Sequence, residues 1–273
     1  MISDTPTLLD AAHAAVSADP ENEAARLRFY ERLADGELLL LLSREARSGD
    51  EAGILDPRIF DLEEGPVVLV FDREDRLADF AGGVVPYAAL PGRVVAGLLR
   101  GQGIGLGVNL GVAPSSMLLP PEAMDWLAET LDGGPEEAEA VPESFVAPSA
   151  PEALVAALDA KLAKAGGLAE AALLVGVRYR GGRAGHMLAF LGAAEGAEPA
   201  LARAAREALV FSGIEAGEMD VVFLNPGEGV LPALARVALR FDLPLPEAPP
   251  RAASGAPAPA APGMDPARPP KLR

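Results

Sequence analysis

The sequence of 273 residues contains no cysteine, and only 5% of its residues are aromatic. Without cysteine the chain can form no disulfide, carry no thiolate nucleophile and hold no cysteine-ligated zinc or iron–sulfur centre. This absence is consistent with a reducing compartment. Half of the residues are hydrophobic, which is enough for a sizeable core. Because aromatic residues are few, we expect that core to be mostly aliphatic.

Long apolar runs are missing as well. The first residues lack a basic stretch followed by an apolar stretch, which a secretory signal requires. The longest leucine run, at 38–42, is far too short to cross a membrane. We therefore expect a soluble, cytoplasmic protein that has no membrane partner.

Basic residues are outnumbered by acidic ones. The chain has 23 Lys and Arg against 40 Asp and Glu, which gives a net charge of −17. The excess is concentrated in residues 1–133, where 23 acidic residues accompany 10 basic ones. Because nucleic-acid affinity depends on basic contacts with the phosphate backbone, this composition argues against a DNA or RNA partner. We interpret the acids as a solvated face that keeps the protein soluble.

Two segments of biased composition divide the chain. Residues 133–151 are rich in Pro, Glu and Ala and have no sustained apolar period, which predicts an interdomain linker. Residues 247–273 form a Pro/Ala tail that cannot bury enough apolar surface to offset its ordering entropy, which predicts disorder. Two folded domains are therefore expected, one at residues 1–132 and the other at residues 152–246.

Helical and strand patterns alternate in the first domain. Ala25, Phe29 and Leu33 recur every four residues, which predicts an amphipathic helix. The run PVVLVFD at 66–72 is short, apolar and β-branched, and it predicts a buried strand that leads into a helix. The run PPEAMDWLAETL at 120–131 predicts a helix opened by proline.

The stretch LLRGQGIGLGVNLG at 98–111 has glycine at every second position from 101 to 107, which raises the question of a nucleotide loop. A dinucleotide fingerprint needs a strand, then a glycine turn, then a helix. Here the patterns predict a helix, then glycines, then a strand. The GxGxxG spacing is absent, and no Gly-Lys-Ser/Thr follows. We therefore predict a strand with one bare face against which another element packs closely, and no nucleotide or other cofactor.

The second domain has a pattern of its own. Leucines repeat every four residues over 154–162 on one face of a predicted helix, and two β runs flank the glycine pair at 181–182, which predicts a hairpin. A helix at 198–213, a strand at 218–225 and a helix at 230–241 are expected to follow. This order predicts a small mixed sheet covered by helices. The expected fold class is thus α/β with α+β character, in two small mixed-sheet domains.

Several runs of the chain together carry a family resemblance. In the first domain these are LRFYERLADGELLLLL, PVVLVFDREDRLADF and LLRGQGIGLGVNLG; in the second they are LVAALDAKL, EMDVVFLN and LRFDLPLP. In this order they resemble the N-terminal and C-terminal domains of the SseB family, the enhanced serine sensitivity proteins. The resemblance implies a two-domain α/β protein of poorly defined molecular activity, connected with serine sensitivity.

Polar residues near the expected sheet ends are the candidates for a reactive or metabolite-binding site. Asp72 and Asp75 follow a buried strand of the first domain, and Asn225 follows a strand of the second, where open α/β folds place ligands. Asp72 also stands where a helix N-cap is wanted, and capping is the commoner use of such a residue. We expect no catalytic residue and no metal site, and interpret the chain as a non-catalytic binding or adaptor protein. The alternative is an enzyme of unrecognised type, or a metabolite-binding protein, that uses these three residues.

One basic cluster lies on a structured part of this acidic protein, in VGVRYRGGRAGH at 175–186. Strand alternation places Arg178 and Arg180 on the same face. With Arg183 and His186 they form a candidate site for an acidic protein partner or a small anionic metabolite, because a guanidinium binds carboxylate or phosphate through two parallel hydrogen bonds. The chain's own acidic domain is a further candidate partner. The alternative is that these arginines only protect a strand edge.

Overall fold

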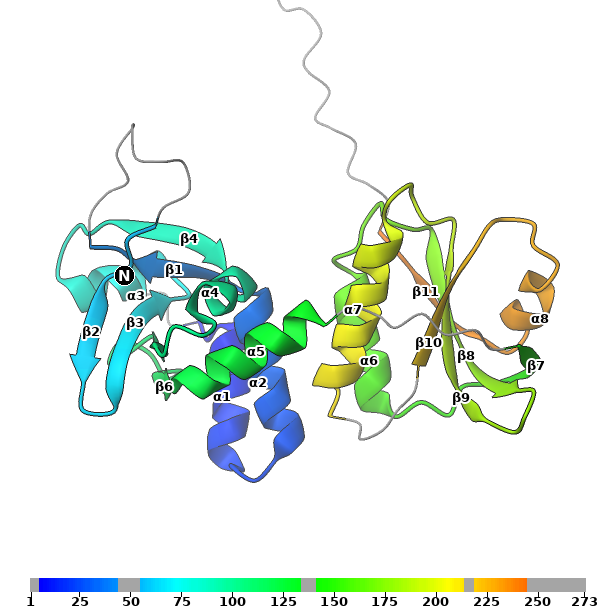
Figure 1. Cartoon of the computed structure of the whole chain (residues 1–273), viewed down its shortest axis with the longest axis horizontal. Helices are drawn as coiled ribbons and strands as arrows, with labels where there is room; N and C mark the ends of the chain where they lie inside the picture. Colours follow the sequence, from blue (N-terminus) through cyan, green and yellow to red (C-terminus); the bar gives the residue numbers. More distant parts are fainter. Residues whose placement is uncertain (1–4, 44–54, 134–140, 214–218, 245–273) are drawn as a thin grey trace, which may run out of the picture.

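The structure is a computed structural model of the chain, and it describes residues 5–43, 55–133, 141–213 and 219–244. Within these residues eight helices and two mixed β-sheets occupy separate regions (Figure 1). The expected α/β class with two mixed sheets is therefore confirmed. The predicted disordered tail lies outside the described residues. No helix among the described residues combines the length and the hydropathy needed to cross a membrane.

The first unit spans residues 5–133, and its described residues, 5–43 and 55–133, form five helices and a six-stranded sheet. The helices are α1 (Leu8–Ala18), α2 (Glu23–Asp35), α3 (Glu74–Ala81), α4 (Gly92–Leu99) and α5 (Pro121–Asp132). The strands are β1 (Glu37–Leu41), β2 (Ile59–Leu62), β3 (Gly65–Phe71), β4 (Tyr87–Pro91), β5 (Gly105–Val108) and β6 (Met117–Leu119). The helices and strands predicted for this part of the sequence are thus present.

The sheet of the first unit has the order β4-β1-β3-β5-β6. Strand β2 pairs with the first residues of β3, and β1 pairs with the last residues of β3. Only β3 and β5 run parallel; the other pairs are antiparallel. Val70 of β3 lies opposite Val108 of β5, so both strands end at the same edge of the sheet. The next residues along the chain, Asp72 and Asn109, therefore meet at that edge.

The core of the first unit lies mainly on one face of this sheet. Helices α1, α2, α4 and α5 cover that face, and the core there includes Phe29 and Leu33 of α2, Val70 of β3 and Leu106 of β5. A smaller apolar cluster on the opposite face includes Leu77 of α3. As expected from the composition, the core is mostly aliphatic.

The alternating glycines belong to two different structures. Gly105 and Gly107 lie in β5, where an added Cβ on either residue would come within 2.6 Å of a neighbouring atom. The prediction of a bare face with closely packed neighbours is therefore confirmed for these two. Gly101 and Gly103 instead have φ angles of 70° and 66° and form the turn before the strand. The expectation that the whole series lies in the strand was wrong, because left-handed backbone ends a strand.

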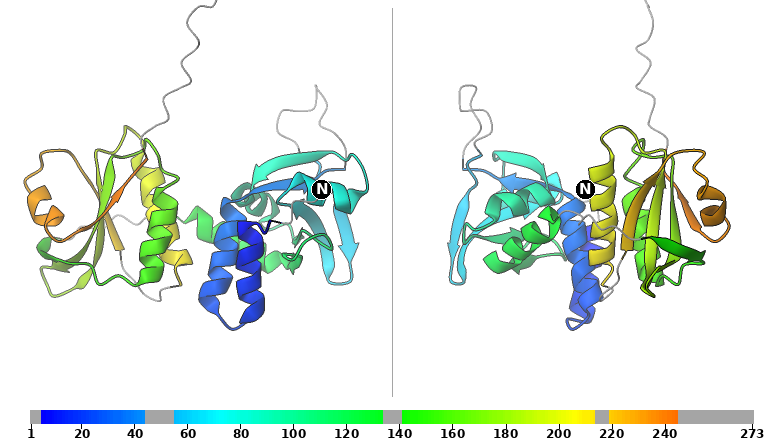
Figure 2. Two further views of the ribbon diagram at one scale, coloured as in Figure 1. Left: turned by 180° about the vertical axis from the view of Figure 1, so that it is seen from behind. Right: turned by 45° about the vertical axis from the view of Figure 1, so that its right-hand side comes forward.

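The second unit spans residues 141–244, and the parts of it that the structure describes, 141–213 and 219–244, form three helices and a five-stranded sheet. The helices are α6 (Glu152–Leu162), α7 (Glu198–Phe211) and α8 (Leu231–Ala235). The strands are β7 (Pro142–Val146), β8 (Ala171–Tyr179), β9 (Ala184–Leu191), β10 (Met219–Leu224) and β11 (Leu239–Asp242). Their order is β10-β9-β8-β11, with β7 paired to β8, and only β9 and β10 run parallel. Helices α6 and α7 lie against one face of the sheet, and α8 lies on the other side (Figures 1 and 2).

Two parts of the second unit differ from the prediction. The expected linker contains β7, which pairs with β8 and partly buries only one large apolar side chain, Phe145. A strand that buries so little leaves no apolar period in the sequence. The expected helix at 230–241 ends at Ala235, and β11 follows it. Phe241 and Leu243 are buried while Asp242 is exposed, which is the two-residue period of a strand.

The remaining predictions for this unit are confirmed. The glycine pair at 181–182 has φ angles of 104° and 91° and joins β8 to β9 as a hairpin. The predicted leucine face of α6 is buried through Leu154, Leu158 and Leu162. The glycine pair between two β runs therefore located the β8–β9 hairpin, and the leucine period located α6.

The two units contact each other through helices. Arg206 of α7 donates from Nη1 to the carbonyl oxygens of Thr130 (2.7 Å) and Gly133 (3.0 Å), so its guanidinium caps the end of α5. Phe211, also on α7, packs into the core of the first unit. In Figures 1 and 2, α7 lies beside α2 and the end of α5.

Candidate functional site

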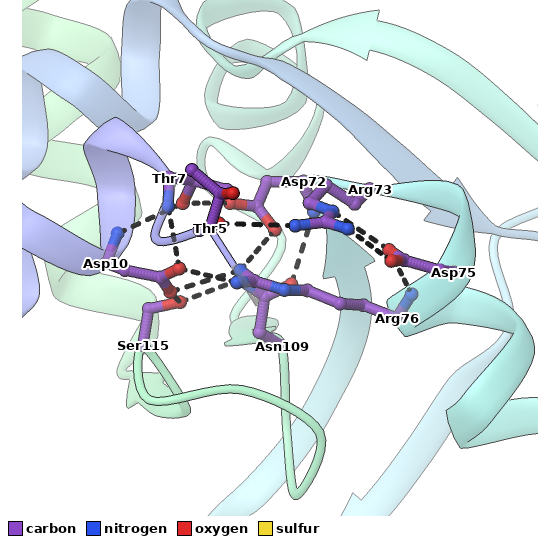
Figure 3. Close-up of polar contacts among 9 residues, drawn as sticks. All are labelled: Thr5, Thr7, Asp10, Asp72, Arg73, Asp75, Arg76, Asn109 and Ser115. Carbon is purple, nitrogen blue, oxygen red and sulfur yellow. Dashed lines mark hydrogen bonds and ion pairs between the residues drawn. The ribbon is translucent and has the colours of Figure 1, made fainter. Parts of the chain in front are cut away.

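A buried polar cluster occupies the edge where β3 and β5 end (Figure 3). We call it the β3–β5 cluster, and its members are Thr7, Asp10, Asp72, Arg76, Asn109 and Ser115. The carboxyl ends of parallel strands are the usual ligand position in open α/β sheets. In this structure the N-terminus of α1 covers that edge.

Arg76 of α3 lies between two carboxylates. Its Nη1 donates to Oδ1 of Asp10 at 3.1 Å and to Oδ1 of Asp72 at 2.8 Å, and its Nη2 donates to Oδ2 of Asp10. The pair with Asp10 is a two-bond fork, the geometry in which a guanidinium binds a carboxylate best. All three side chains are at most 10% exposed, so the guanidinium is held from both sides in a largely dry environment.

Asn109 and Ser115 complete the surroundings of Asp10. Asn109 accepts a bond from the backbone N–H of Asp72 (3.2 Å), and its amide nitrogen donates to Oγ of Ser115 (2.9 Å). The Ser115 hydroxyl donates in turn to Oδ1 of Asp10. Asn109 has a φ of 48°, a left-handed conformation that non-glycine residues adopt at a cost and that is enriched at functional positions.

The start of α1 is tied to the cluster by a capping box. The Asp10 backbone N–H donates to Oγ1 of Thr7 (3.1 Å), and the Thr7 N–H donates to Oδ2 of Asp10 (2.9 Å). The Thr7 hydroxyl donates to Oδ2 of Asp72 at 2.7 Å. The cap thus stabilises the helix end and also attaches it to the end of β3.

The electrostatics of the cluster favour a fully ionised carboxylate at Asp10. Burial alone disfavours its charged form, but hydrogen bonds from Arg76, Ser115 and the Thr7 backbone outweigh burial and hold the pKa of Asp10 well below its usual range. The pKa of Arg76 is correspondingly raised, because its bonds to Asp10 and Asp72 outweigh its own burial. A carboxylate of such low pKa cannot remove a proton from the Ser115 hydroxyl near neutral pH. The arrangement is suited to holding charges in place rather than to proton transfer.

The structure does not bring the predicted polar residues together. Asp72 belongs to the cluster, but Asp75 forms a surface pair with Arg73 (Nε to Oδ1, 3.0 Å), and Asn225 follows β10 in the other sheet. The interpretation of Asp72 as a helix N-cap was wrong. The N-cap of α3 is Arg73, which makes no side-chain capping bond, because the Asp72 carboxylate is turned toward Thr7 and Arg76.

No group of three or more His, Asp or Glu side chains in the described part of the chain is placed to hold a metal ion. Ser115 is a member of the β3–β5 cluster that the sequence analysis did not single out. Its separation of 105 residues from Asp10 leaves no local pattern to detect. The only signal was its position in the loop that follows the glycine-rich strand.

The predicted basic residues of the hairpin fall on two faces of the second sheet. Arg178 and Arg180 are exposed, and neither side chain has an ion pair or hydrogen bond among the described residues. Arg183 lies over the ring of Tyr179, 4.3 Å from its centroid, and pairs with Asp220 at 3.0 Å. Tyr179 packs on the α8 side of the sheet, so alternation along β8 places Arg178 on the opposite side from Arg183.

His186 lies on β9, between Gly176 of β8 and Met219 of β10. Met187, its neighbour along the strand, packs on the α8 side, so His186 and Arg178 share the other face. The Nε2 atom of His186 is buried and has no hydrogen-bond partner among the described residues. The bare backbone of Gly176 beside it contacts Val146 of β7 closely, since a Cβ there would lie 2.8 Å from that side chain.

A second charged cluster joins the two units and was not predicted from the sequence. We call it the interunit cluster: Glu31, Asp35, Arg93, Lys161, Lys164 and Glu207. The Nζ atom of Lys161 lies 2.8 Å from carboxylate oxygens of both Asp35 and Glu207, and 3.8 Å from Glu31. Arg93 binds Glu207 at 3.0 Å and Asp35 at 2.6 Å from the other side.

The carboxylates of the interunit cluster are held ionised. Burial opposes the charge of Asp35, but the hydrogen bond and charge of Lys161, with Lys164 and Arg93, outweigh it and lower the pKa of Asp35 to about 2. The pKa of Glu207 is lowered for the same reason, with bonds from Arg93 and Lys161 outweighing its burial. Contacts between the acidic first unit and the second thus use Lys161 and Arg93, while Arg178 and Arg180 lie elsewhere.

Comparison with known proteins gives one match. No curated protein and no solved structure matches the chain. The likeness of residues 152–246 to an SseB C-terminal domain stays a prediction, because the match does not extend to them. Residues 9–126, which include most of the first unit and the whole β3–β5 cluster except Thr7, are similar to the family described as SseB protein N-terminal domain.

Proposed function

We propose that this protein is a non-catalytic binding protein that holds an acidic partner on the β8–β9 hairpin through Arg178 and Arg180. One observation carries the proposal: both guanidinium groups are exposed and have no ionic partner among the described residues, in a chain of net charge −17. Other basic side chains on the second unit, such as Lys161 and Arg183, are already paired with carboxylates. A free pair of guanidinium groups is the natural contact for carboxylates of a partner.

The β3–β5 cluster supports the non-catalytic part of this proposal. Ser115 donates to Asp10 and accepts a bond from Asn109, and the lowered pKa of Asp10 makes that carboxylate a poor base for activating the hydroxyl. Arg76 is paired with two carboxylates through three hydrogen bonds. An active site built on these groups would first have to break buried ion pairs.

The arrangement of the units supports an adaptor role. The interunit cluster and the Arg206 cap fix α7 against the first unit. A partner bound at the hairpin would therefore be held at a defined position relative to the acidic first unit. Fixed geometry of this kind lowers the entropic cost of bridging two partners.

The test uses a fluorescently labelled decaglutamate peptide as an acidic probe. Fluorescence anisotropy is measured with the full chain, with the variant Arg178→Glu/Arg180→Glu, and with a matched control, Arg203→Glu/Arg236→Glu. The control makes the same change of charge at two other exposed arginines, on α7 and just after α8. We expect binding to weaken by about tenfold or more in the first variant only, and to fade in the full chain as salt rises.

If probe binding weakened equally in both double variants, the effect would come from the change in net charge, and the assignment of the site to the hairpin would be overturned. No binding of the probe by the full chain at low salt would overturn the acidic-partner proposal itself.

A separate experiment addresses the connection with serine sensitivity, which we propose from the similarity of residues 9–126 to the SseB N-terminal domain. Cells lacking the protein are compared with complemented cells on medium with excess serine, and equal growth would refute that connection.

A further inference from the structure

In the β3–β5 cluster, donor groups next to the sheet bind the carboxylate of Asp10, which comes from helix α1. On the sheet side, Arg76 presents a two-bond fork and Ser115 presents a hydroxyl proton. Asn109 orients that hydroxyl by donating to its oxygen, so the serine proton must point toward the carboxylate. The carboxylate of Asp10 fills this set of donors (Figure 3).

The charges of the cluster do not require Asp10. Arg76 is paired with Asp72 at 2.8 Å, within the same helix-and-strand segment, and this pair is neutral. Asp10 adds a second carboxylate to the one guanidinium, so the three side chains together carry one surplus negative charge. On the sheet side, Arg76 and Ser115 donate to the Asp10 carboxylate and Asn109 orients the serine hydroxyl, and a second carboxylate of similar size would meet the same donors.

Helix α1, which supplies Asp10, is only lightly attached to the rest of the unit. Of its 11 residues, Leu9, Asp10 and Ala12 are buried, while Leu8 is 71% exposed. Its main packing partner is α2, which follows directly in the chain. Leu9, Ala12 and the partly buried Val16 pack against the core, and His13 contacts the Phe29 ring edge-on. The bonds of Asp10 and Thr7 are the polar attachment of α1 to the sheet edge, so loss of the Asp10 bonds would weaken that attachment.

We propose that Arg76, Ser115 and Asn109 form a binding site for a small carboxylate ligand, that Asp10 occupies this site in the free protein, and that the ligand displaces Asp10 and releases α1. The site lies where open α/β sheets bind ligands. Occupation by Asp10 keeps the buried guanidinium and hydroxyl paired when no ligand is bound, which avoids the cost of leaving them unsatisfied. This site is distinct from the hairpin arginines, so its failure and theirs are independent.

The proposed carboxylate-binding site is tested first with Asp10→Ala, which removes one carboxylate group and leaves space the size of formate. We expect formate to raise the melting temperature of this variant saturably, by about 5 °C when the ligand is in large excess over its Kd. Propionate, which is larger than the space, and chloride at matched ionic strength should have little effect. Asp10→Asn is the control, because its amide fills the site and should exclude formate. An equal rise in the melting temperatures of Asp10→Asn and Asp10→Ala with formate would overturn the proposed binding site.

Displacement is tested in the unmodified protein by hydrogen exchange. With acetate, the amides of residues 8–18 should exchange faster, in a saturable way, while those of β8 at residues 171–179, in the other sheet, serve as the internal reference. Chloride and phosphate at the same ionic strength are the comparison arms, since neither presents the planar two-oxygen edge of a carboxylate. Should Asp10→Ala fail to fold, this measurement decides alone. Unchanged exchange in α1, or the same change with chloride, would show that Asp10 is a permanent structural residue and overturn the proposal.

Discussion

Lys161 of α6 and Asp35 of α2 are 126 residues apart in the chain, and their charged groups lie 2.8 Å apart between the two units. Both side chains are less than 10% exposed. Glu31 and Glu207 place two further carboxylates around the same ammonium group. Lys161 is therefore the main positive charge at the contact between the two units, and Arg93 supplies a second one.

Replacement of Lys161 by methionine should destabilise the protein strongly. The change keeps the length of the side chain but leaves the buried carboxylates with less positive charge, and removal of one partner of a buried ion pair costs about 3 kcal/mol. Urea unfolding measures the loss. Lys164→Met is the matched control, because Lys164 binds the same Asp35 carboxylate but is 55% exposed, and a pair of that kind contributes about 0–1 kcal/mol. Equal losses in the two variants would contradict a central role for Lys161.

Stability should fall in acid because of the same cluster. The pKa of Asp35 is lowered to about 2 in the folded protein from 3.8, so the unfolded chain binds a proton at higher pH than the folded one. The stabilisation is complete above about pH 5 and disappears as pH falls toward 2; for Asp35 it is on the order of 2 kcal/mol. Glu207, whose pKa is also lowered, adds to the same trend. Urea unfolding between pH 7 and pH 3 checks this, and Lys161→Met should show a shallower dependence.

Local patterns in the sequence were sufficient for most elements. The four-residue repeat of Phe29 and Leu33 and the apolar run of β3 depend on neighbours within one element, and both were found. Strand β7 was missed because it partly buries only one large apolar side chain, Phe145, and its Pro/Glu composition matches that of a linker. Strand β11 was missed because its first three residues, 239–241, were merged into the preceding helical pattern.

The polar clusters could not be predicted, because their contacts join distant parts of the chain. Asp10 and Arg76 are separated by 66 residues, and no periodicity connects an acid on one helix with a base on another. The position of Asp72 at a strand end was recognised, but its partner was not, and capping was chosen because it needs only local residues. Long-range ion pairs follow from the topology, which places the ends of β3 and β5 together.

Ser115→Ala should destabilise the first unit more than the same change at the next residue. Ser115 is fully buried and donates to Asp10 while accepting from Asn109. Its loss leaves the Asn109 amide unsatisfied, which costs about 1–3 kcal/mol. Ser116→Ala is the control, because that exposed hydroxyl only accepts a bond from the Gly111 N–H. Thermal unfolding of both variants measures the difference, and a loss at Ser116 as large as at Ser115 would argue against tight closure of the β3–β5 cluster.

Replacement of glycine by alanine should have opposite effects on stability at two positions. A Cβ on Gly105 of β5 would lie 2.6 Å from the carbonyl oxygen of Leu119 in the paired strand β6. Gly105→Ala should therefore push the strands apart, at a cost of about 1–3 kcal/mol. Gly97 lies inside helix α4 with open space where its Cβ would stand, so Gly97→Ala should stabilise the protein by about 0.5–1 kcal/mol through its higher helix propensity. Urea unfolding of the two variants gives both signs. A neutral Gly105→Ala would mean that β5 and β6 can separate without loss, and it would remove the steric reason for glycine in that strand.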